Sequence, residues 1–579
     1  MRPGFLSFAI VSSLFACSPA KPPTPAVERL GAEVVQSLCG AAPPASAQRY
    51  VDAAQGDDAL DGKCASARAG CGPWKTLARA FEALEPGTRL VLAAGQYEAP
   101  GVPVPSGRAD AWVTLAPADG APAVLTGTLH TEKSGFVRLQ ALSFASPDGA
   151  RWLSSDAATH DLEVVGNVFD SSNGSAGDFS GVFVAGRNVS VCGNTFGSWL
   201  GDLIHTESVD GFVFAHNDLS QASGQHALFQ LVGVRTIIRG NVFSNPWQRT
   251  FVTNPRDDDH PTRDVLIEDN VVVASNWDGK SPLPSDDKGG DAAARIGGSH
   301  VIVRNNLFTG NRPGLQWDCS GALSIAVYDS RATNNGYLAN RMEHMRLYHN
   351  TFQGNALNAV GIYGEYDSIP LFADDVVFSN DVFSDSGAYH VKVCADWMPW
   401  HTWRFDHDVF GPQGAATPFS LVTRVAGVPT GEVPLEVAQR DAGAVFSSNQ
   451  AVPPAFRDAA RLTAATNDAA QRTLPRLDEL FRAAELTHAL ESAPLTTVTA
   501  AATRATTIHV ADAAGFFDGF GLEAGDEVQV GTQVARVTHA GDGTLELDAP
   551  VDAAVGDGVW LTRFGVRATP GVHPRPARR

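Results

Sequence analysis

The chain has 579 residues, of which 18% are charged and 56 are glycine, and its formal net charge at pH 7 is −20. This length suffices for a large core and for more than one structural unit, and the composition is typical of a turn-rich β protein. The acidic balance argues against nucleic acid or an anionic membrane surface as a partner. It also disfavours a polyanionic sugar, unless bridging cations or a local basic groove are present.

Residues 1–17 have the features of an export signal, because Arg2 precedes an apolar stretch and Ala16 stands just before Cys17. They resemble a bacterial lipoprotein signal. The resemblance implies that Cys17 is lipidated and, with Ser18 next to it, that the protein is anchored in the cell envelope at the outer membrane. The alternative is an ordinary signal peptide with an incidental cysteine. Residues 18–47 are predicted to be a flexible tether, and no other apolar run predicts a transmembrane helix.

Two of the remaining cysteines, Cys64 and Cys71, lie close together in a Gly- and Ala-rich loop, which predicts a local disulfide in an oxidising compartment. The other four have no metal-ligand spacing, so no zinc site is predicted and their pairing stays open. They are Cys39, Cys192, Cys319 and Cys394. Cys192 falls on a predicted strand, in a position that also suits a simply buried side chain.

One short pattern then recurs nine times in the form apolar-x-apolar-x-x-Asn-x-apolar, at intervals of 23 to 44 residues. The Asn position is occupied by Asn167, Asn194, Asn217, Asn241, Asn270, Asn306 and Asn350, then by Asp381 and Asp408. Alternate residues of a strand face opposite sides, so the apolar positions point inward on every turn. Stacked turns bury them as one column. The repeat therefore predicts a solenoid, with the Asn side chains forming a polar ladder at a bend.

The repeat resembles that of right-handed parallel β-helix proteins, the fold of pectate lyases and related extracellular polysaccharide-acting proteins. The opening segment is similar to the cap of secreted β-helix proteins, in which a short helix covers the first coil. Its motifs are Tyr50-Val51-Asp52, Gly56-Asp57-Asp58, Pro73-Trp74-Lys75-Thr76-Leu77, Pro86-Gly87 and Gly95-Gln96-Tyr97. The resemblance covers about residues 49–420. We expect an all-β, monomeric protein whose partner is a polysaccharide.

Polar residues that interrupt the apolar strands are the main functional signal. Enzymes that resemble pectate lyases use an outward strand face, walled by long loops, as a groove. Strands before the Asn positions carry such residues here, and the loops 254–263 and 276–291 follow them. The residues are His205, Glu207, His226, Gln230, Arg249 and Arg295. A register slip of one residue exchanges inside for outside, so scattered solvent-facing residues are the alternative.

Lyase chemistry assigns catalytic roles to part of this set. β-Elimination from a uronate needs a base beside the proton that is removed and a cation that stabilises the resulting charge. We predict His226 or Lys288 as the base, and Arg249 or Arg295 as the cation.

A calcium ion is a second source of positive charge, because carboxylates are the hard oxygen ligands that it prefers. Asp286, Asp287 and Asp291 surround Lys288, and 257–259 are also acidic. Solvated loop residues are the alternative. For substrate binding we predict His205, Glu207, Gln230, Trp247 and Trp277, since aromatic rings stack on sugars.

Other functions stay open. Hydrolysis needs two carboxyl groups about 5–10 Å apart, for which Glu207 and Asp202 are available. No strand carries the adjacent Asp pair of β-helix polygalacturonases, which lowers that option. Epimerisation and non-catalytic carbohydrate binding or adhesion would use the same groove.

After Asp408 the repeat stops. We predict the β-helix over 48–420, a mixed and partly helical linker over 421–491, a small β-barrel or sandwich over 492–566 and a disordered tail over 567–579. Capping of the last coil is the favoured role of the β module, since an exposed coil end is an open sheet edge.

Overall fold

The computed structural model describes part of the chain, in segments separated by gaps. The described residues are 31–146, 149–170, 180–197, 199, 201–220, 222, 227–244, 249–253, 261–275, 292–312, 319–327, 342–364, 373–394, 402–411, 419–421, 430–467, 477–488, 490–562 and 570–573.

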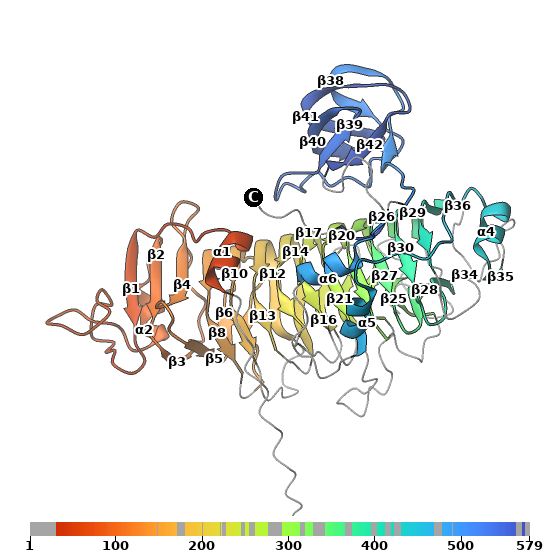
Figure 1. The fold of residues 1–579 in the computed structure, drawn as a ribbon. Helices are drawn as coiled ribbons and strands as arrows, with labels where there is room; N and C mark the ends of the chain where they lie inside the picture. The colour runs from red at the N-terminus through yellow and green to blue at the C-terminus, as the bar shows by residue number, and fades with distance from the viewer. Residues whose placement is uncertain are drawn as a thin grey trace, which may run out of the picture.

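The strands stack into a coil with three faces (Figure 1), in which nearly all neighbouring strands pair in parallel. The first face consists of β6 (Leu129–His130), β9 (Leu153–Ser154), the N-terminal halves of β12 (Ser180–Cys192) and β14 (Asp202–Ala215), β16 (Ala227–Leu231), β19 (Arg249–Thr253), β22 (Ala294–Ile296), β25 (Gly321–Val327), β28 (Asn358–Gly364), β31 (Val391–Val393) and β34 (Phe419–Leu421).

The second face contains β1 (Ala47–Val51), β2 (Thr88–Leu92), β4 (Val113–Pro117), β7 (Gly135–Gln140), β10 (His160–Val165), the C-terminal halves of β12 and β14, β17 (Gly233–Arg239), β20 (Arg263–Glu268), β23 (Ser299–Arg304), β26 (Met342–Tyr348), β29 (Ala373–Ser379), β32 (Arg404–Asp406) and β36 (Phe446–Ser447).

The third face contains β3 (Gly95–Glu98), β5 (Ala123–Thr126), β8 (Ser143–Ala145), β11 (Val168–Asp170), β13 (Thr195–Phe196), β15 (Asp218–Leu219), β18 (Val242–Phe243), β21 (Val271–Val273), β24 (Leu307–Thr309), β27 (Thr351–Gln353), β30 (Val382–Ser384) and β33 (Val409–Phe410). The fold is therefore the right-handed parallel β-helix that the repeat predicts.

Apolar columns fill the coil, as the repeat requires. The rings of Phe144, Phe169 and Phe196 stack on successive turns, with centroids 4.7 and 4.8 Å apart. These distances match the spacing between neighbouring strands, so each ring lies directly over the next. Trp403, expected in the core from its place in the repeat, is fully buried.

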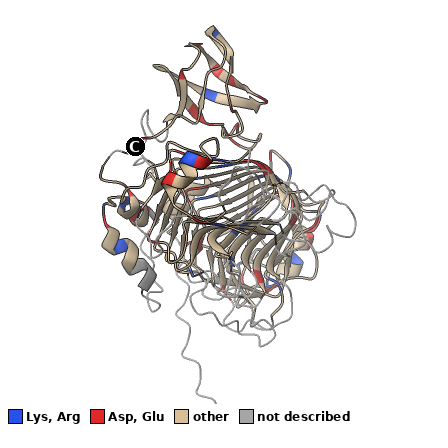
Figure 2. Cartoon of the chain, turned by 90° about the vertical axis from the view of Figure 1, so that its right-hand side faces the viewer, with Lys and Arg blue, Asp and Glu red and all other residues tan. Residues whose placement is uncertain are grey.

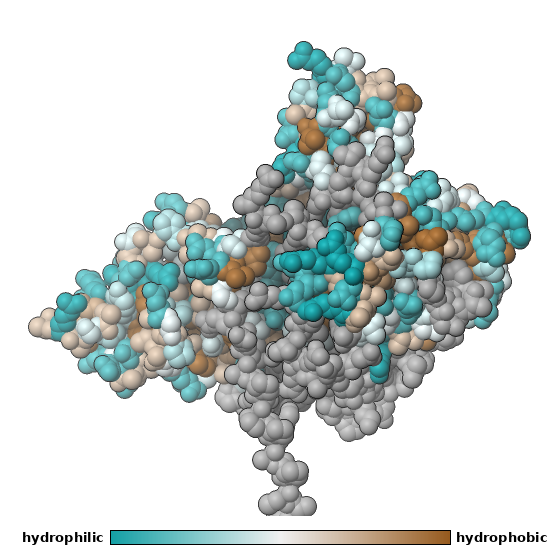
Figure 3. Space-filling model, in the orientation of Figure 1, coloured by the Kyte–Doolittle hydropathy of each residue, from teal (hydrophilic) through white to brown (hydrophobic). Residues whose placement is uncertain are grey.

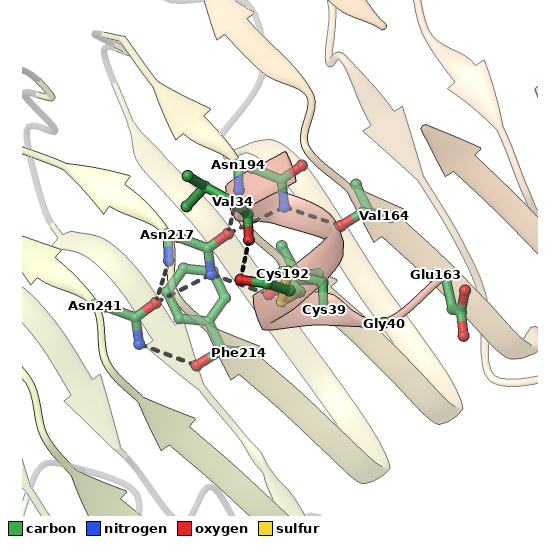
Figure 4. Close-up of a disulfide and its surroundings, with 12 residues drawn as sticks. Val34, Cys39, Gly40, Glu163, Val164, Cys192, Asn194, Phe214, Asn217 and Asn241 are labelled. Atoms are coloured by element: carbon green, nitrogen blue, oxygen red, sulfur yellow. Dashed lines mark hydrogen bonds between the residues drawn. A yellow bond between two sulfur atoms is a disulfide. The ribbon is translucent and has the colours of Figure 1, made fainter. Parts of the chain in front are cut away.

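The predicted asparagine ladder is present at the bend between the second and third faces (Figure 4). Asn194 is typical: its backbone N–H and its Nδ2 donate to Asn217 Oδ1 at 2.9 and 3.0 Å, and its Nδ2 also donates to the Val164 carbonyl at 2.9 Å. The same bonds recur at the asparagine positions from Asn167 to Asn306 and satisfy their buried polar groups. Asn449 forms a tenth rung of the ladder, because its Oδ1 accepts a hydrogen bond from the Asp408 N–H.

Two acids interrupt this ladder. Asp381 and Asp408 are fully buried, and in each of them Oδ2 has no hydrogen-bond partner, whereas an asparagine has a donating amide there. Burial raises the pKa of Asp381 to about 8. Burial, with the neighbouring Asp381 carboxyl adding to it, raises the pKa of Asp408 well above its usual range.

We expect Asp381→Asn to stabilise the coil and to flatten its pH dependence. The folded-state pKa of Asp381 lies above its unfolded value of about 4, so the folded state binds the extra proton between about pH 4 and pH 8 and stability falls as the pH rises through that range. Replacing an unsatisfied buried oxygen with a donor gains about 1–3 kcal/mol at pH 8. Thermal unfolding from pH 4 to pH 9 measures this. Asn350→Asp, the reverse change one rung away, should make stability fall more steeply with rising pH. If the wild-type protein and both variants showed the same pH dependence of stability, the assignment of that dependence to the buried carboxyl groups would be wrong.

Helices close both ends of the coil. α2 (Leu77–Ala83) buries Leu77, Ala80 and Phe81 in the core, which is the cap that the opening motifs predict. α4 (Leu435–Asp441) buries Leu435 and Ala438 at the other end. Because β36 still pairs with β32 and Gln450 with Val409, the coil runs to Gln450 and not to 420 as predicted.

The β module does not cap the coil, which corrects that expectation. Its sheet comprises β37 (Thr496–Thr497), β38 (Ala502–His509), β39 (Glu527–Val530), β40 (Gln533–Gly541), β41 (Thr544–Ala553) and β42 (Gly558–Leu561). It stands on the side of the coil, above β17, β20 and β26 (Figures 1 and 2). Phe516, Phe517 and Phe520 share one buried cluster with Ile237 and Leu266 of the second face. The coil end needed no further cover because α4 already supplies it.

Buried ion pairs fix the module on the second face. Arg304 donates to both oxygens of Asp526 at 2.7 and 2.8 Å and to Glu268 at 2.8 Å. Arg346 pairs with Asp512 at 2.7 Å. Because Asp526 and Asp512 lie more than 160 residues from their arginine partners in sequence, these contacts are specific tertiary ones.

Other appendages occupy the second and third faces. α1 (Ala32–Cys39) lies on the second face, where Cys39 forms a disulfide with Cys192 (Figure 4), so Cys192 is not simply a buried thiol. α5 (Ala459–Asn467) and α6 (Leu477–Ala484) pack on β21 and β24 of the third face through Leu462, Leu480 and Phe481. The outer surface of α6 is hydrophilic (Figure 3). No helix in the described ranges is long and apolar enough to cross a bilayer.

Candidate functional site

A single row of side chains points outward along the first face. Residues that flank its members in sequence, such as Ile204, Phe229 and Leu323, lie in the coil core, so alternation along each strand places the row outside. Pairing between strands puts the row in register over eleven turns. Its members are His130, Ser154, Phe183, His205, Gln230, Val252, Arg295, Ser324, Gly361, Lys392 and Ser420.

The row is accessible at its two ends and covered in its middle. His130, Ser154, Phe183, Gln230 and, at the other end, Ser420 are partly exposed. His205 is 6% exposed, whereas Val252, Arg295 and Ser324 are fully buried. A ligand that approaches the first face therefore meets the turns from His130 to Gln230.

A histidine and a carboxylate form the chemically most distinctive pair of the row. Asp202 is fully buried at the start of β14, and its Oδ2 lies 3.1 Å from His205 Nδ1, while its Oδ1 accepts the Ala227 N–H at 3.1 Å. A carboxylate at Nδ1 holds the imidazole in the tautomer whose Nε2 accepts a proton. The His205 ring also stacks on Phe183, with an interplanar angle of 9°. A buried carboxylate beside an imidazole is an arrangement that can support proton transfer at the ring.

The ionisable residues of the row are all basic. They are His130, His205, Arg295 and Lys392, in a chain with 63 acidic residues and 43 lysines and arginines. Each histidine contacts a carboxylate, Glu132 or Asp202, and Arg295 and Lys392 are buried, so the row carries cationic side chains without being an exposed basic surface.

The structure brings together part of the predicted site. His205, Gln230 and Arg295 share the row, and Glu207 lies two residues after His205 on the same strand, where the register between β12 and β14 shifts by one residue. Arg249 is not on the row, because it pairs with Ala227 in the column of Asp202.

Several predicted residues lie outside the described part of the chain, and their roles stay predictions. They are Cys17, His226, Trp247, Trp277, Asp286, Asp287, Lys288 and Asp291. Among the described residues no group of three His, Cys, Asp or Glu side chains is placed to hold a metal ion. The proposed Ca²⁺ ligands are not among the residues searched.

Sequence reasoning missed the role of Asp202 and the place of Phe183. Asp202 stands three residues before His205, and alternation along a strand would put two such residues on opposite sides. Phe183 was not singled out from the sequence, and it is partly exposed beside His205. The sequence signal that could have singled out Asp202 is its position, because it is a charged residue at the start of the strand β14, directly before the apolar Leu203 and Ile204.

The cysteine pairs are all formed in the described part of the chain. Cys64–Cys71 confirms the predicted local disulfide. Cys39–Cys192 and Cys319–Cys394 link residues 153 and 75 positions apart. Cys319–Cys394 spans the first face, close to the row.

The sheet topology defines the chain as a right-handed parallel β-helix of pectate-lyase-like architecture. No family model and no curated protein sequence matches it. Among solved structures it is similar to pectate lyase Pel9A, with 15% identity, coverage of 63% of this chain and 81% of that one, and a TM-score of 0.34. Similarity to XylC in complex with xylose has 8% identity, 89% and 98% coverage and a TM-score of 0.43. A PL6 alginate lyase in complex with a trisaccharide has 15% identity, 73% and 90% coverage and a TM-score of 0.37. At these low sequence identities the similarity concerns the fold alone.

Proposed function

We propose that the protein acts on a polysaccharide at the first face and cleaves it by β-elimination. The observation that carries the proposal is His205, oriented by the buried Asp202 and set in a row of basic and aromatic residues in register. Similar solved structures that are lyases of pectate and alginate support the same substrate class.

The chemistry divides between three kinds of residue. His205 Nε2 takes the proton beside the carboxylate of a uronate, the electron pair forms a carbon–carbon double bond, and the glycosidic oxygen leaves and gains a proton. Phe183 offers an aromatic face to a sugar ring. Arg249, two turns from His205 and partly exposed, attracts the substrate's carboxylates, whereas Arg295, three turns away, is fully buried and adds positive charge beneath the surface. General-base catalysis of this type contributes about 10²–10⁴-fold in rate.

Calcium remains part of this proposal. Asp286, Asp287 and Asp291 have the oxygen ligands that Ca²⁺ prefers, and Lys288 among them is a second candidate base. A chelator separates the two versions of the mechanism, because catalysis through His205 and arginine survives it and catalysis through Ca²⁺ does not.

The proposal is tested by incubating the mature protein with polygalacturonate, alginate and neutral polysaccharides, with and without chelator. The expected result is ultraviolet absorbance of unsaturated products from at least one uronate polymer. New reducing ends without that absorbance would indicate hydrolysis. If no polymer gave either signal, the proposal that the protein is an enzyme would be contradicted.

Carbohydrate binding without catalysis is the second candidate, because Phe183 and Gln230 are the aromatic and amide side chains that a lectin-like surface uses. Retention on an immobilised polymer that is never cleaved would favour it. In hydrolysis Asp202 would have to act as one of the two carboxyl groups, but Asp202 is buried beneath His205.

We also propose that the mature protein is anchored in the bacterial cell envelope by a lipid on Cys17. The signal-like residues 1–17 support this, as do three disulfides, which are typical of an oxidising compartment. Labelled palmitate should enter the wild-type protein and not the Cys17→Ala variant, and equal labelling of both would contradict the anchor.

A further inference from the structure

Residues 570–573, which we call the latch, lie against the coil at the bend between the second and third faces, although the sequence predicts a disordered tail over 567–579. Asn305 holds the latch with both ends of its side-chain amide. The His573 N–H donates to Asn305 Oδ1 at 2.6 Å, and Asn305 Nδ2 donates to the His573 carbonyl at 3.1 Å. An amide carries an acceptor and a donor, so one asparagine can bind both polar groups of a residue's backbone.

Asn380, at the same bend on a later turn, binds the chain on both sides of the β module. The Ala493 N–H donates to Asn380 Oδ1 at 2.9 Å, and Asn380 Nδ2 donates to the Ala493 carbonyl at 3.1 Å. The Gly571 N–H donates to the Asn380 carbonyl at 2.8 Å. Ala493 precedes the module and Gly571 follows it, so the coil holds the chain where it enters the module and where it returns.

The backbone of the latch fits closely against the coil. The Val572 N–H donates to Thr351 Oγ1 at 3.0 Å. Gly571 has a φ of +86°, and a Cβ atom on it would lie 2.9 Å from both Thr351 Oγ1 and Val382 Cγ2. Glycine is required here, because the left-handed conformation and the close approach both exclude a side chain.

The side chain of Val572 fills an apolar pocket. It is 2% exposed and shares a buried cluster with Leu307 of β24, Leu462 of α5 and Phe481 of α6. Val572 therefore lies between the α5–α6 hairpin and the third face. Hydrogen bonds to the main chain and a pocket for one side chain are the features by which proteins bind peptides.

We propose that this site is a peptide-binding site, selective for a Gly-Val segment, and that the chain fills it with its own latch to hold the β module and the α5–α6 hairpin on the coil. The proposal is independent of the lyase activity. Residues 563–569 alone separate the module from the latch. So short a connection gives a tethered ligand an effective concentration on the order of millimolar. The latch therefore stays bound even where the isolated segment binds weakly.

The first test is binding of the segment as a separate peptide. In the full-length Val572→Asp protein the latch carries a charge that the apolar pocket excludes, so the site is open. We expect a labelled peptide of residues 567–579 to bind this variant in an anisotropy titration, and to bind the wild-type protein roughly tenfold or more weakly, because the resident latch competes. The peptide with the same Val572→Asp change should bind neither protein. Gly571→Val is a second open variant, in which the added side chain meets Thr351 and Val382.

Asparagine variants supply the matched control. Asn305→Ala, added to Val572→Asp, should weaken peptide binding, because it removes the amide that holds the latch. Asn188 has nearly the same left-handed φ, 52° against 51°, but its amide donates to Asp161. Asn188→Ala thus imposes the same backbone strain and should leave binding unchanged. Equal weakening by both changes, or no peptide binding to either open variant, would overturn the proposal.

The second test measures what the latch holds. Amide hydrogen exchange should be faster in the open variants than in the wild-type protein, both in α6 and around Phe516 and Phe517, where the module contacts the coil. Saturating peptide should restore protection to α6, because it refills the pocket. It should not restore protection to the module, because it is not joined to it. Unchanged exchange in both regions, or restoration of both, would show that the segment is no latch.

Discussion

His205→Ala is expected to lower the rate of polymer cleavage by about 10²–10⁴-fold, the contribution of a general base. Asp202→Asn should have an effect of similar direction, because an amide in place of the carboxylate can donate to Nδ1 and so move the imidazole proton to Nε2. KM should change less than kcat in both variants, since neither removes the aromatic and cationic contacts with the sugar. Initial rates on the polymer that the wild-type protein cleaves give the measurement.

His130→Ala is the matched control for this experiment. His130 lies on the same row, three turns before His205, and contacts a different carboxylate, Glu132, at 3.1 Å. Its loss should weaken substrate binding modestly and leave kcat nearly unchanged. If His130→Ala lowered kcat as much as His205→Ala, or if both were harmless, the assignment of His205 as the base would be wrong.

Arg304→Met should cost about 3–5 kcal/mol of stability, the usual loss when one partner of a buried ion pair is removed. Arg304 is 2% exposed and bridges Glu268 of the coil and Asp526 of the β module. Without it, the carboxylate of Asp526 is desolvated against the coil with no guanidinium beside it. We expect the module to unfold at lower temperature than the coil, as a second calorimetric transition.

Arg440→Met gives the comparison for that loss. Arg440 and Asp441 form an ion pair on the exposed surface of α4, a kind of contact that adds little stability. This variant should unfold like the wild-type protein. A single unchanged transition for Arg304→Met would mean that the apolar contacts of Phe516 and Phe517 hold the module by themselves.

The β module packs on the second face and leaves the first face uncovered. The described appendages pack on the second and third faces: α1 and the module on the second, and α5 and α6 on the third. The first face keeps the row with His205. The module is therefore a fixed part of the scaffold on another face, and contact with the substrate at the row falls to the coil.

The interior of the coil was predictable because its contacts repeat. Every turn packs on the next, so an apolar residue at the same place in each repeat must meet its equivalents, and Phe169 and Phe196 do. The same holds for the ladder from Asn167 onward. Cys64–Cys71 was predictable because only seven positions separate the two residues.

The outward row was predictable only in part. Turns of 23 to 44 residues carry loops of different length, and strands pair across them whatever that length is. Arg249 shows the consequence: it is polar and stands on the right strand, but its register places it in the column of Asp202. A shift of one residue decides which side chains point outward.

By itself, the sequence determined the stacked turns, the buried phenylalanine column, the asparagine ladder and the helix that caps the first coil. Each follows from a periodic pattern whose partners lie one turn away. Only the tertiary structure decided that Asp202 contacts His205, that Cys319 pairs with Cys394 and that the β module stands on the second face. Those contacts join residues whose spacing in the chain carries no period, so they become visible only when hydrogen bonding between strands has set the register of every turn.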